Sequence, residues 1–428
     1  MCGYVFYSFW NYKYCILLAF STSVSYFAGL AFLKWKTSGA RRICLVIPLV
    51  IDLSLLGVFK YFNFAMSSWS DFISGLGFYI ITPHLSRSLP LGISFYTFHT
   101  ITYIVDSYRG KIVPTRNFFE FACYVSFFPQ LVAGPIVRFR QVEGDLERID
   151  HPDLPDALER GMSFLTLGMI KKVLIADSIA RLVNPALANW SNLSTASAWL
   201  CALGYTYQLY FDFSGYSDMA VGLALFFGIR LPQNFNSPYK ALDLSDFWRR
   251  WHISLSTILR DYLYIPMGGG RDGNWATCRN LMVTMVLGGL WHGANWTFVG
   301  WGAYHGLLLI ATRYSFRGIV RVPEWLRRAV TFVLVVVGWV LFRATSFTMA
   351  AGWLGKMFIW DSAAGVTGAW TLVLLILIAA GLAHCCPNSF ELSHRWDWAT
   401  ALALTTLFAA CLVTIYGGKA SQFLYFQF

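Results

Sequence analysis

The sequence predicts an all-α, polytopic membrane protein, and three properties of the chain support this prediction. Of its 428 residues, 57% are hydrophobic and only 13% are charged. A soluble domain is usually about 45–50% apolar and about 25% charged, so this chain has too little charge to cover a soluble globule. Apolar runs long enough to cross about 30 Å of hydrocarbon also recur along it. Together these properties exclude an ordinary cytosolic enzyme, a disordered chain and a small disulfide-stapled module.

The predicted membrane helices follow the apolar runs in order. Clear candidates are residues 14–33, 43–62, 89–105, 196–228, 281–311, 329–342, 366–384 and 398–416. Residues 118–133 and 161–182 are less regular, because a proline or a lysine pair interrupts the run. With the longest run split, we expect about ten or eleven membrane-embedded helices. No internal repeat and no long polar segment is visible, so we expect a single domain over residues 1–428.

The basic character of the chain fits a membrane protein better than a nucleic-acid-binding one. The net charge is +11, and its lysines and arginines stand singly or in pairs between apolar runs. Positive-inside signals beside membrane helices have this distribution. The nine cysteines form no C-x-x-C pair and lie mostly within apolar runs. We interpret them as buried free thiols.

The centre of the chain, at about residues 205–306, holds the polar groups that could carry chemistry. Asp212 and Asp218 lie six residues apart in an otherwise apolar helix. Ionisable groups at membrane depth are costly and usually face a cavity or a partner. Two interpretations stay open for this pair, a polar scaffold around a cavity or direct contact with substrate.

Residues 243–271, DLSDFWRRWHISLSTILRDYLYIPMGGGR, are too charged to span lipid and yet are rich in aromatic residues. Apolar residues recur at helical spacing at Trp248, Trp251 and Leu255. Charge is supplied by Arg249, Arg250, Arg260 and Asp261. This pattern predicts an amphipathic helix at the cytoplasmic interface, or one sunk into a protein cavity, with His252 inside it. The glycines at 268–270 indicate a turn and are weak evidence for a phosphate-binding loop.

His292 is the most suggestive single residue in the apolar run 281–311. A neutral imidazole can act as a general base near neutral pH. Glycines at 288, 289 and 293 would let a ligand or another backbone come close to it. A core histidine bonded to a neighbouring carbonyl is the alternative. For His305, thirteen residues on, we favour the structural interpretation.

The sequence lacks the motifs of several other classes of enzyme. It contains no H-E-x-x-H or comparable zinc spacing, so we expect no metal. It contains no G-x-S-x-G nucleophile elbow either.

Three long motifs of the centre resemble the membrane-bound O-acyltransferase family. They are FDFSGYSDMAVGLALFFGIRLPQNFNSPY, DFWRRWHISLSTILRDYLYIPMGG and LGGLWHGANWTFVGWGAYHG. Within that family, the chain is most similar to the membrane subunit of alginate O-acetylation and its bacterial relatives. PLGISFYTFHTITYIVDSYRG, FFPQLVAGPIVRFRQ and the closing FLYFQF extend the resemblance over nearly the whole length.

The resemblance implies a helical bundle with re-entrant pieces around a central tunnel in the bacterial inner membrane. It implies that His292 is the essential active-site histidine and that His252 is the second hallmark residue. Acetyl-CoA would be the cytoplasmic acyl donor, with no tightly bound cofactor. The acetyl group would leave on the periplasmic side through an esterase-like partner to an exported polysaccharide. Alginate is the first candidate acceptor, and cellulose, peptidoglycan or another cell-surface glycan are the alternatives.

Further roles follow from side-chain chemistry and not from the resemblance. Asn295 could polarise the thioester oxygen as an oxyanion donor. Arg249, Arg250 and Lys240 could contact the phosphates of coenzyme A, although a positive-inside flank explains these residues equally well. Supporting or tunnel-lining positions are expected at Trp291, Asp261, Arg260, Asp212 and Asp218.

Two other classes of protein compete with an acyltransferase. A transporter would show internal repeats with matching broken helices, and none is visible. A non-catalytic scaffold subunit would tolerate the loss of His292.

Overall fold

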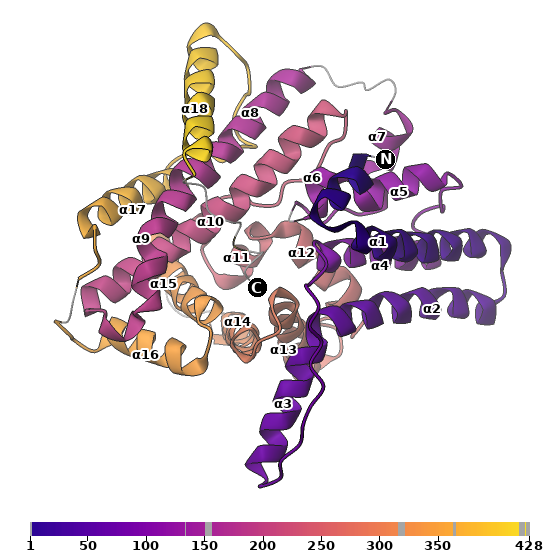
Figure 1. Ribbon diagram of the computed structural model, residues 1–428, viewed down its shortest axis with the longest axis horizontal. Helices are drawn as coiled ribbons and strands as arrows, with labels where there is room; N and C mark the ends of the chain where they lie inside the picture. Colours follow the sequence, from indigo (N-terminus) through magenta and orange to yellow (C-terminus); the bar gives the residue numbers. More distant parts are fainter. Residues whose placement is uncertain are drawn as a thin grey trace. The chain divides into compact units, whose positions relative to one another are not determined.

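The helices of the computed structural model follow the apolar pattern of the sequence (Figure 1). The structure describes residues 2–132, 134–149, 156–315, 322–362, 365–418 and 424. Within these residues every regular element is a helix, which confirms the all-α prediction. Of the closing motif FLYFQF, all but Leu424 lies outside the described residues.

The chain forms two compact units. The first comprises Met1–Pro155 and Ala224–Pro232, and the second comprises Asp156–Leu223 and Gln233–Phe428. The residues expected to carry chemistry all belong to the second unit. A single domain over residues 1–428 stays a prediction.

The first unit is built around α1, α2 and α4. Its elements are α1 (Cys2–Lys34), α2 (Ser38–Leu56), the π-helical turn η1 (Gly57–Tyr61), α3 (Phe62–Gly75), α4 (Ile93–Tyr108), α5 (Phe118–Ser126), α6 (Phe128–Leu131) and α7 (Phe139–Glu147). Buried Asp52 of α2 accepts hydrogen bonds from Ser21 of α1 and Thr100 of α4, both at 2.7 Å. A buried carboxylate needs such donors, so this contact holds the three helices together.

The second unit contains the remaining helices. Its first half holds α8 (Ala157–Met169), η2 (Ile170–Ala176), α9 (Asp177–Ala188), η3 (Trp190–Asn192), α10 (Thr195–Phe226, whose last turn belongs to the first unit) and η4 (Pro238–Lys240). Its second half holds α11 (Leu244–Arg250), α12 (Ile253–Ile258), η5 (Leu259–Tyr264), α13 (Gly273–His292), α14 (Trp296–Ser315), α15 (Glu324–Arg343), α16 (Phe347–Phe358), α17 (Ala369–His384) and α18 (Trp398–Tyr416).

Glycines let α8 and α10 lie against each other (Figure 1). A Cβ atom on Gly168 of α8 would stand 2.5 Å from the carbonyl oxygen of Gly215 of α10. A Cβ atom on Gly222 would stand 2.6 Å from the carbonyl oxygen of Gly161. Small residues at helix contacts of this kind are typical of membrane proteins, where close van der Waals packing drives association.

Four helical segments of the described chain are long and apolar enough to cross a membrane. They are Cys2–Lys34, Ser38–Gly75, Glu324–Arg343 and Trp398–Tyr416, and Ala369–His384 is a shorter apolar helix. These segments agree with the polytopic membrane protein that the sequence predicts. The count of ten or eleven embedded helices and the central tunnel stay predictions.

Three predicted apolar segments are interrupted in the structure. Residues 118–133 break at Phe127, because Pro129 in the first turn of α6 cannot continue the preceding helix. Residues 161–182 pass through the π-helical turn η2, which carries the lysine pair. Residues 281–311 divide into α13 and α14.

Candidate active site

The spacing of apolar residues in the segment 243–271 predicts one amphipathic helix. In the structure this helix is broken at His252. α11 ends at Arg250, α12 begins at Ile253, and His252 between them has a left-handed backbone with φ of 43°. A segment without regular secondary structure, residues 233–237, lies alongside and takes up the freed backbone groups. The Asn236 amide donates to the Arg250 carbonyl and the Ile253 amide donates to the Asn234 carbonyl, each at 2.9 Å. This pairing overrides the helical period at His252.

His252 is completely buried and is held on one side by an asparagine. Its Nδ1 lies 3.1 Å from Oδ1 of Asn234, and its ring meets Phe213 edge to face with centroids 4.7 Å apart. Burial lowers the pKa of His252 to about 3, so the imidazole is neutral at physiological pH. Its Nε2 has no hydrogen-bond partner among the described residues.

His292 is the last residue of α13 and is 4% exposed. It forms part of the wall of a cavity of about 220 Å³. The cavity is lined by Trp248, Leu255, Ser256, Leu259, Arg260, Tyr264, Leu281, Thr284, Met285, Gly288, His292, Trp301 and Leu309. Most of these side chains are apolar, so the histidine stands against a space that suits an uncharged group.

The two histidines are neighbours, but only one lines this cavity. Their ring centroids are 6.5 Å apart. Trp291 contacts both, with its ring centroid 5.0 Å from that of His292 and 6.0 Å from that of His252. Trp291 thus packs against both histidines, and the supporting role expected for it from the sequence stays a prediction.

The three glycines near His292 have different functions. A Cβ on Gly289 would lie 2.2 Å from the Phe298 carbonyl oxygen, and one on Gly293 would lie 2.2 Å from the Phe298 ring. These two glycines therefore allow α14 to approach α13. Gly288 lines the cavity, and a Cβ there would meet only the end of the Leu259 side chain, at 3.0 Å.

Among the expected basic residues, Arg260 is the one that lines the cavity. Its side chain is 59% exposed, whereas His292 is buried, so Arg260 belongs to the open side of the space. Its Nε donates to Asp261 at 2.7 Å. Asp261 therefore orients the guanidinium from a supporting position.

The expected phosphate ligands Arg249, Arg250 and Lys240 do not line this cavity. Arg249 and Arg250 of α11 form ion pairs with Asp246 at 3.8 and 2.9 Å. The ammonium group of Lys240 donates to the Cys386 carbonyl at 2.7 Å. Ion pairs within the short helix α11 therefore explain why its two arginines are there.

Asn295 holds the start of α14. Its Oδ1 accepts from the Thr297 amide at 2.9 Å, and its Nδ2 donates to the Thr345 carbonyl at 3.1 Å. It does not line the cavity. A role in oxyanion stabilisation finds no support in this position.

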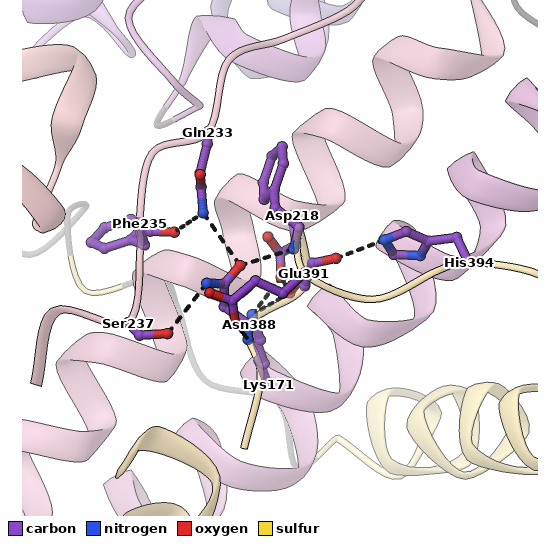
Figure 2. Close-up of polar contacts among 10 residues, drawn as sticks. Lys171, Asp218, Gln233, Phe235, Ser237, Asn388, Glu391 and His394 are labelled. Atoms are coloured by element: carbon purple, nitrogen blue, oxygen red, sulfur yellow. Dashed lines mark hydrogen bonds and ion pairs between the residues drawn. The ribbon is translucent and has the colours of Figure 1, made fainter. Parts of the chain in front are cut away.

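Asp212 and Asp218 are paired with the two lysines of η2. Asp212 lies 2.7 Å from the Lys172 ammonium, and Asp218 lies 2.5 Å from that of Lys171. Figure 2 shows Asp218 in a polar cluster with Lys171, Asn388 and Glu391. Ser389 also donates a hydrogen bond to Asp218. Neither carboxylate lines the cavity, so the scaffold interpretation has the geometric support.

His305 is completely buried among aromatic rings, with centroids 5.0 Å from Trp301 and 5.3 Å from Trp248. This position agrees with the structural interpretation. Among the described residues, no group of three or more His, Cys, Asp or Glu side chains is placed to hold a metal ion.

Two features of the site escaped the sequence reasoning. Asn234 contacts His252, although eighteen residues separate them in the chain. Lys171 and Lys172 form ion pairs with the two aspartates of α10. The sequence contained a signal for these ion pairs, because two cations in one apolar run and two carboxylates in another favour pairing.

The regular elements of the described residues are helices, and a buried histidine at the end of α13 lies against an apolar cavity. Comparison with known families identifies the class of protein to which this arrangement belongs. Residues 111–351 match the membrane-bound O-acyltransferase family, and the chain belongs to that family. It is therefore a multi-pass membrane acyltransferase. This confirms the resemblance and the enzyme class expected from the central motifs.

Three members of the family are similar to this chain over nearly its whole length. The chain is 40% identical to the probable alginate O-acetylase of Pseudomonas aeruginosa, across all of this chain and 93% of that protein. It is 41% identical to the probable alginate O-acetylase of Azotobacter vinelandii, with the same coverage of both chains. It is 35% identical to the peptidoglycan O-acetyltransferase of Helicobacter pylori, across 99% of this chain and 89% of that protein.

Proposed function

We propose that this chain is an O-acetyltransferase of the bacterial inner membrane. It takes the acetyl group from acetyl-CoA on the cytoplasmic side and passes it on for O-acetylation of an exported polysaccharide. Alginate is the first candidate, because the two relatives of about 40% identity are named as alginate O-acetylases.

The position of His292 in the wall of an apolar cavity is the observation that carries this proposal. A thioester and its acetyl group are uncharged, so burial in such a space costs little. Arg260 on the open side of the same cavity offers a permanent positive charge to the phosphates of the donor. The cavity thus has the two features that a negatively charged molecule with an apolar reactive end requires.

The chemical step needs one base. His292 takes the proton of the acceptor hydroxyl while the oxygen attacks the carbonyl carbon of the thioester. The carbon–sulfur bond breaks, and the sulfur leaves with the electron pair as the thiolate of coenzyme A. The imidazolium then returns its proton to that thiolate. The products are an acetyl ester and a free thiol, and the histidine ends in its starting state.

His252 serves on the other side of the reacting group. It is neutral and buried, and its ring centroid lies 6.5 Å from that of His292, which lines the cavity. It accepts a hydrogen bond from the acceptor hydroxyl and holds that group for His292. An esterase-like periplasmic partner then transfers the acetyl group from this ester to a hydroxyl of the polymer, which frees the first acceptor hydroxyl.

Peptidoglycan is the second candidate acceptor. The relative of 35% identity that is named as a peptidoglycan O-acetyltransferase matches nearly the whole chain, which favours this alternative. Transfer of label to alginate oligosaccharides, compared with peptidoglycan fragments, separates the two.

The test uses purified protein in detergent with acetyl-labelled coenzyme A and these acceptors. Thiol release and label transfer are followed for wild type and for His292→Gln, with His84→Gln as the matched control. His84 is exposed in the first unit and belongs to no part of the site. We expect His292→Gln to lose at least about 100-fold in turnover, and His84→Gln to match wild type.

Equal thiol release by wild type and His292→Gln would contradict the catalytic assignment. A folded wild-type chain that neither binds the donor nor releases thiol would replace the enzyme with a transporter or a scaffold subunit.

A further inference from the structure

We propose that Asn234 is a positioning residue for the acyl transfer. Its side chain fixes His252 in the tautomer that carries hydrogen on Nδ1, and it thereby leaves Nε2 as a hydrogen-bond acceptor. This inference rests on the proposed function, in which His252 receives the acceptor hydroxyl.

The orientation of the Asn234 amide is set by its other contacts. Its oxygen lies 3.3 Å from the backbone amide of Ser254 and 2.8 Å from the hydroxyl of Ser254. A backbone amide can only donate, so the side-chain atom facing it must be an oxygen. The amide nitrogen of Asn234 donates to the Ser217 hydroxyl at 3.1 Å. The backbone amide of Ser254 therefore sets the orientation, and the Ser217 hydroxyl, which can accept, is compatible with it.

This orientation decides the tautomer of His252. Oδ1 of Asn234 is an acceptor, so the imidazole nitrogen 3.1 Å away must donate its hydrogen to it. A neutral imidazole carries only one N–H, which is then on Nδ1. The lone pair is left on Nε2.

Nε2 of His252 is buried and has no partner among the described residues. The rings of Trp291 and His292 are among its neighbours, and His292, the titratable one of the two, also lines the cavity. A buried acceptor without a donor is costly, which makes it a place for a substrate hydroxyl. The hydroxyl donates to Nε2, and its oxygen is then held beside His292.

Asn234 can hold the imidazole because residues 233–237 are fixed from both sides. On one side they form the backbone hydrogen bonds to Arg250 and Ile253. On the other side Asn388 donates to Asn236 at 3.1 Å and to Ser237 at 3.2 Å. Figure 2 shows Asn388 between Gln233 and Ser237, joined to both. A positioning residue needs such support behind it.

The first experiment measures the tautomer directly. Protein with nitrogen-15-labelled histidine is examined by NMR in lipid, and the His252 signals are assigned by their loss in His252→Gln. We expect a single neutral tautomer with hydrogen on Nδ1 in wild type. In Asn234→Leu, which removes the acceptor, we expect hydrogen on Nε2 in a substantial fraction of molecules. Hydrogen on Nε2 in wild type would overturn the proposal.

The second experiment links the tautomer to the reaction. Asn234→Leu should lower turnover by at least about 100-fold, which is the size of a typical acid–base contribution. Asn234→Asp keeps an oxygen acceptor and should retain turnover. Its carboxylate favours the imidazolium and raises the pKa of His252, so the acid limb of the pH–rate profile should move to higher pH.

Asn184→Leu is the matched control, since it makes the same change at a half-buried asparagine of α9 whose Oδ1 has no hydrogen-bond partner among the described residues. It should retain most of the turnover with an unchanged pH profile. If Asn184→Leu loses as much turnover as Asn234→Leu, or the pH profile of Asn234→Asp does not move, the residue is only structural and the proposal fails. A wild-type chain without acyl transfer would refute the proposed function, and the tautomer measurement would still decide the hydrogen bond.

Discussion

At the scale of single residues, what a charged side chain does depends on the partner it finds. Arg249 and Arg260 belong to the same polar segment, and both are exposed by more than half. Arg249 pairs with Asp246 in the same short helix, whereas Arg260 lines the cavity that contains His292. From the sequence, we expected Arg249 to contact the phosphates of coenzyme A and Arg260 to take a supporting or tunnel-lining position. Position relative to the cavity separates them.

Arg260→Gln should weaken the binding of acetyl-CoA. A hydrogen bond to a charged group is worth about 1.5–3 kcal/mol, so we expect KM for the donor to rise about tenfold or more. Turnover at saturating donor should change little, because the contact proposed for Arg260 is with the phosphates of the donor and not with the reacting atoms. Thiol release measured over a range of acetyl-CoA concentrations checks both values.

Arg249→Gln is the matched control for this experiment, and its KM should stay at the wild-type value. If instead Arg249→Gln raises KM and Arg260→Gln does not, the phosphates bind beside α11, as the charge pattern of the sequence alone suggests.

At the scale of secondary-structure elements, α13 and α14 position His292. A Cβ on Gly302 of α14 would lie 2.4 Å from the Met285 carbonyl oxygen, and a Cβ on Gly289 of α13 would lie 3.1 Å from Gly302. The two backbones therefore touch with no side chain between them. This contact fixes the end of α13, where His292 stands, against Trp301 of α14.

Gly289→Ala should destabilise the protein. Its methyl group would meet the Phe298 carbonyl oxygen at 2.2 Å, and that oxygen belongs to the backbone and cannot turn away. Overpacking usually costs about 1–3 kcal/mol, so thermal unfolding in detergent, followed by circular dichroism, should occur at a clearly lower temperature.

The neighbouring change Gly288→Ala provides the comparison. Its methyl group would meet only the end of the Leu259 side chain, which can shift, so the unfolding temperature should stay near that of wild type. The methyl enters the cavity, and donor KM should rise. Equal unfolding temperatures for the two variants would refute the assignment of Gly289 to helix packing.

At the scale of the whole molecule, buried polar contacts join parts of the second unit that are far apart in sequence. Lys171 of η2 pairs with Asp218 of α10, and Ser389 bonds to both. Lys172 pairs with Asp212 and with Asp177. These contacts connect η2, α9, α10 and the segment that carries Asn388, and through Asn388 also residues 233–237, which include Asn234.

Lys171→Met should be strongly destabilising, because it leaves the Asp218 carboxylate buried without its cation. Removal of one partner of a buried pair costs about 3–5 kcal/mol. The double variant Lys171→Met, Asp218→Leu should recover most of this loss, because no uncompensated charge remains. Thermal unfolding of the two variants beside wild type gives the comparison. A double variant as unstable as the single one would show that the pair does not act as a unit.

The sequence by itself determined the class of the fold, and it predicted where the candidate site lies. Hydropathy adds up along the chain, so membrane helices can be predicted wherever a run is uniformly apolar. The two runs that the sequence marks as irregular, at Pro129 and at the lysine pair, are interrupted in the structure. At His252 the helical spacing gave no such sign, because backbone hydrogen bonds to residues 233–237 break the helix there. The central motifs were long enough to identify the family, which the comparison confirmed.

Only the tertiary structure decided which side chains meet. It placed Arg260 in the cavity, and it engaged Arg249, Arg250, Lys240 and Asn295 in other bonds. It also brought Asn234 to His252. The physical reason is that a hydrogen bond needs a donor–acceptor distance of about 3 Å, kept to within a few tenths of an ångström, between groups remote in the chain. Such distances follow from how the helices pack, whereas the hydropathy of a segment depends on that segment alone.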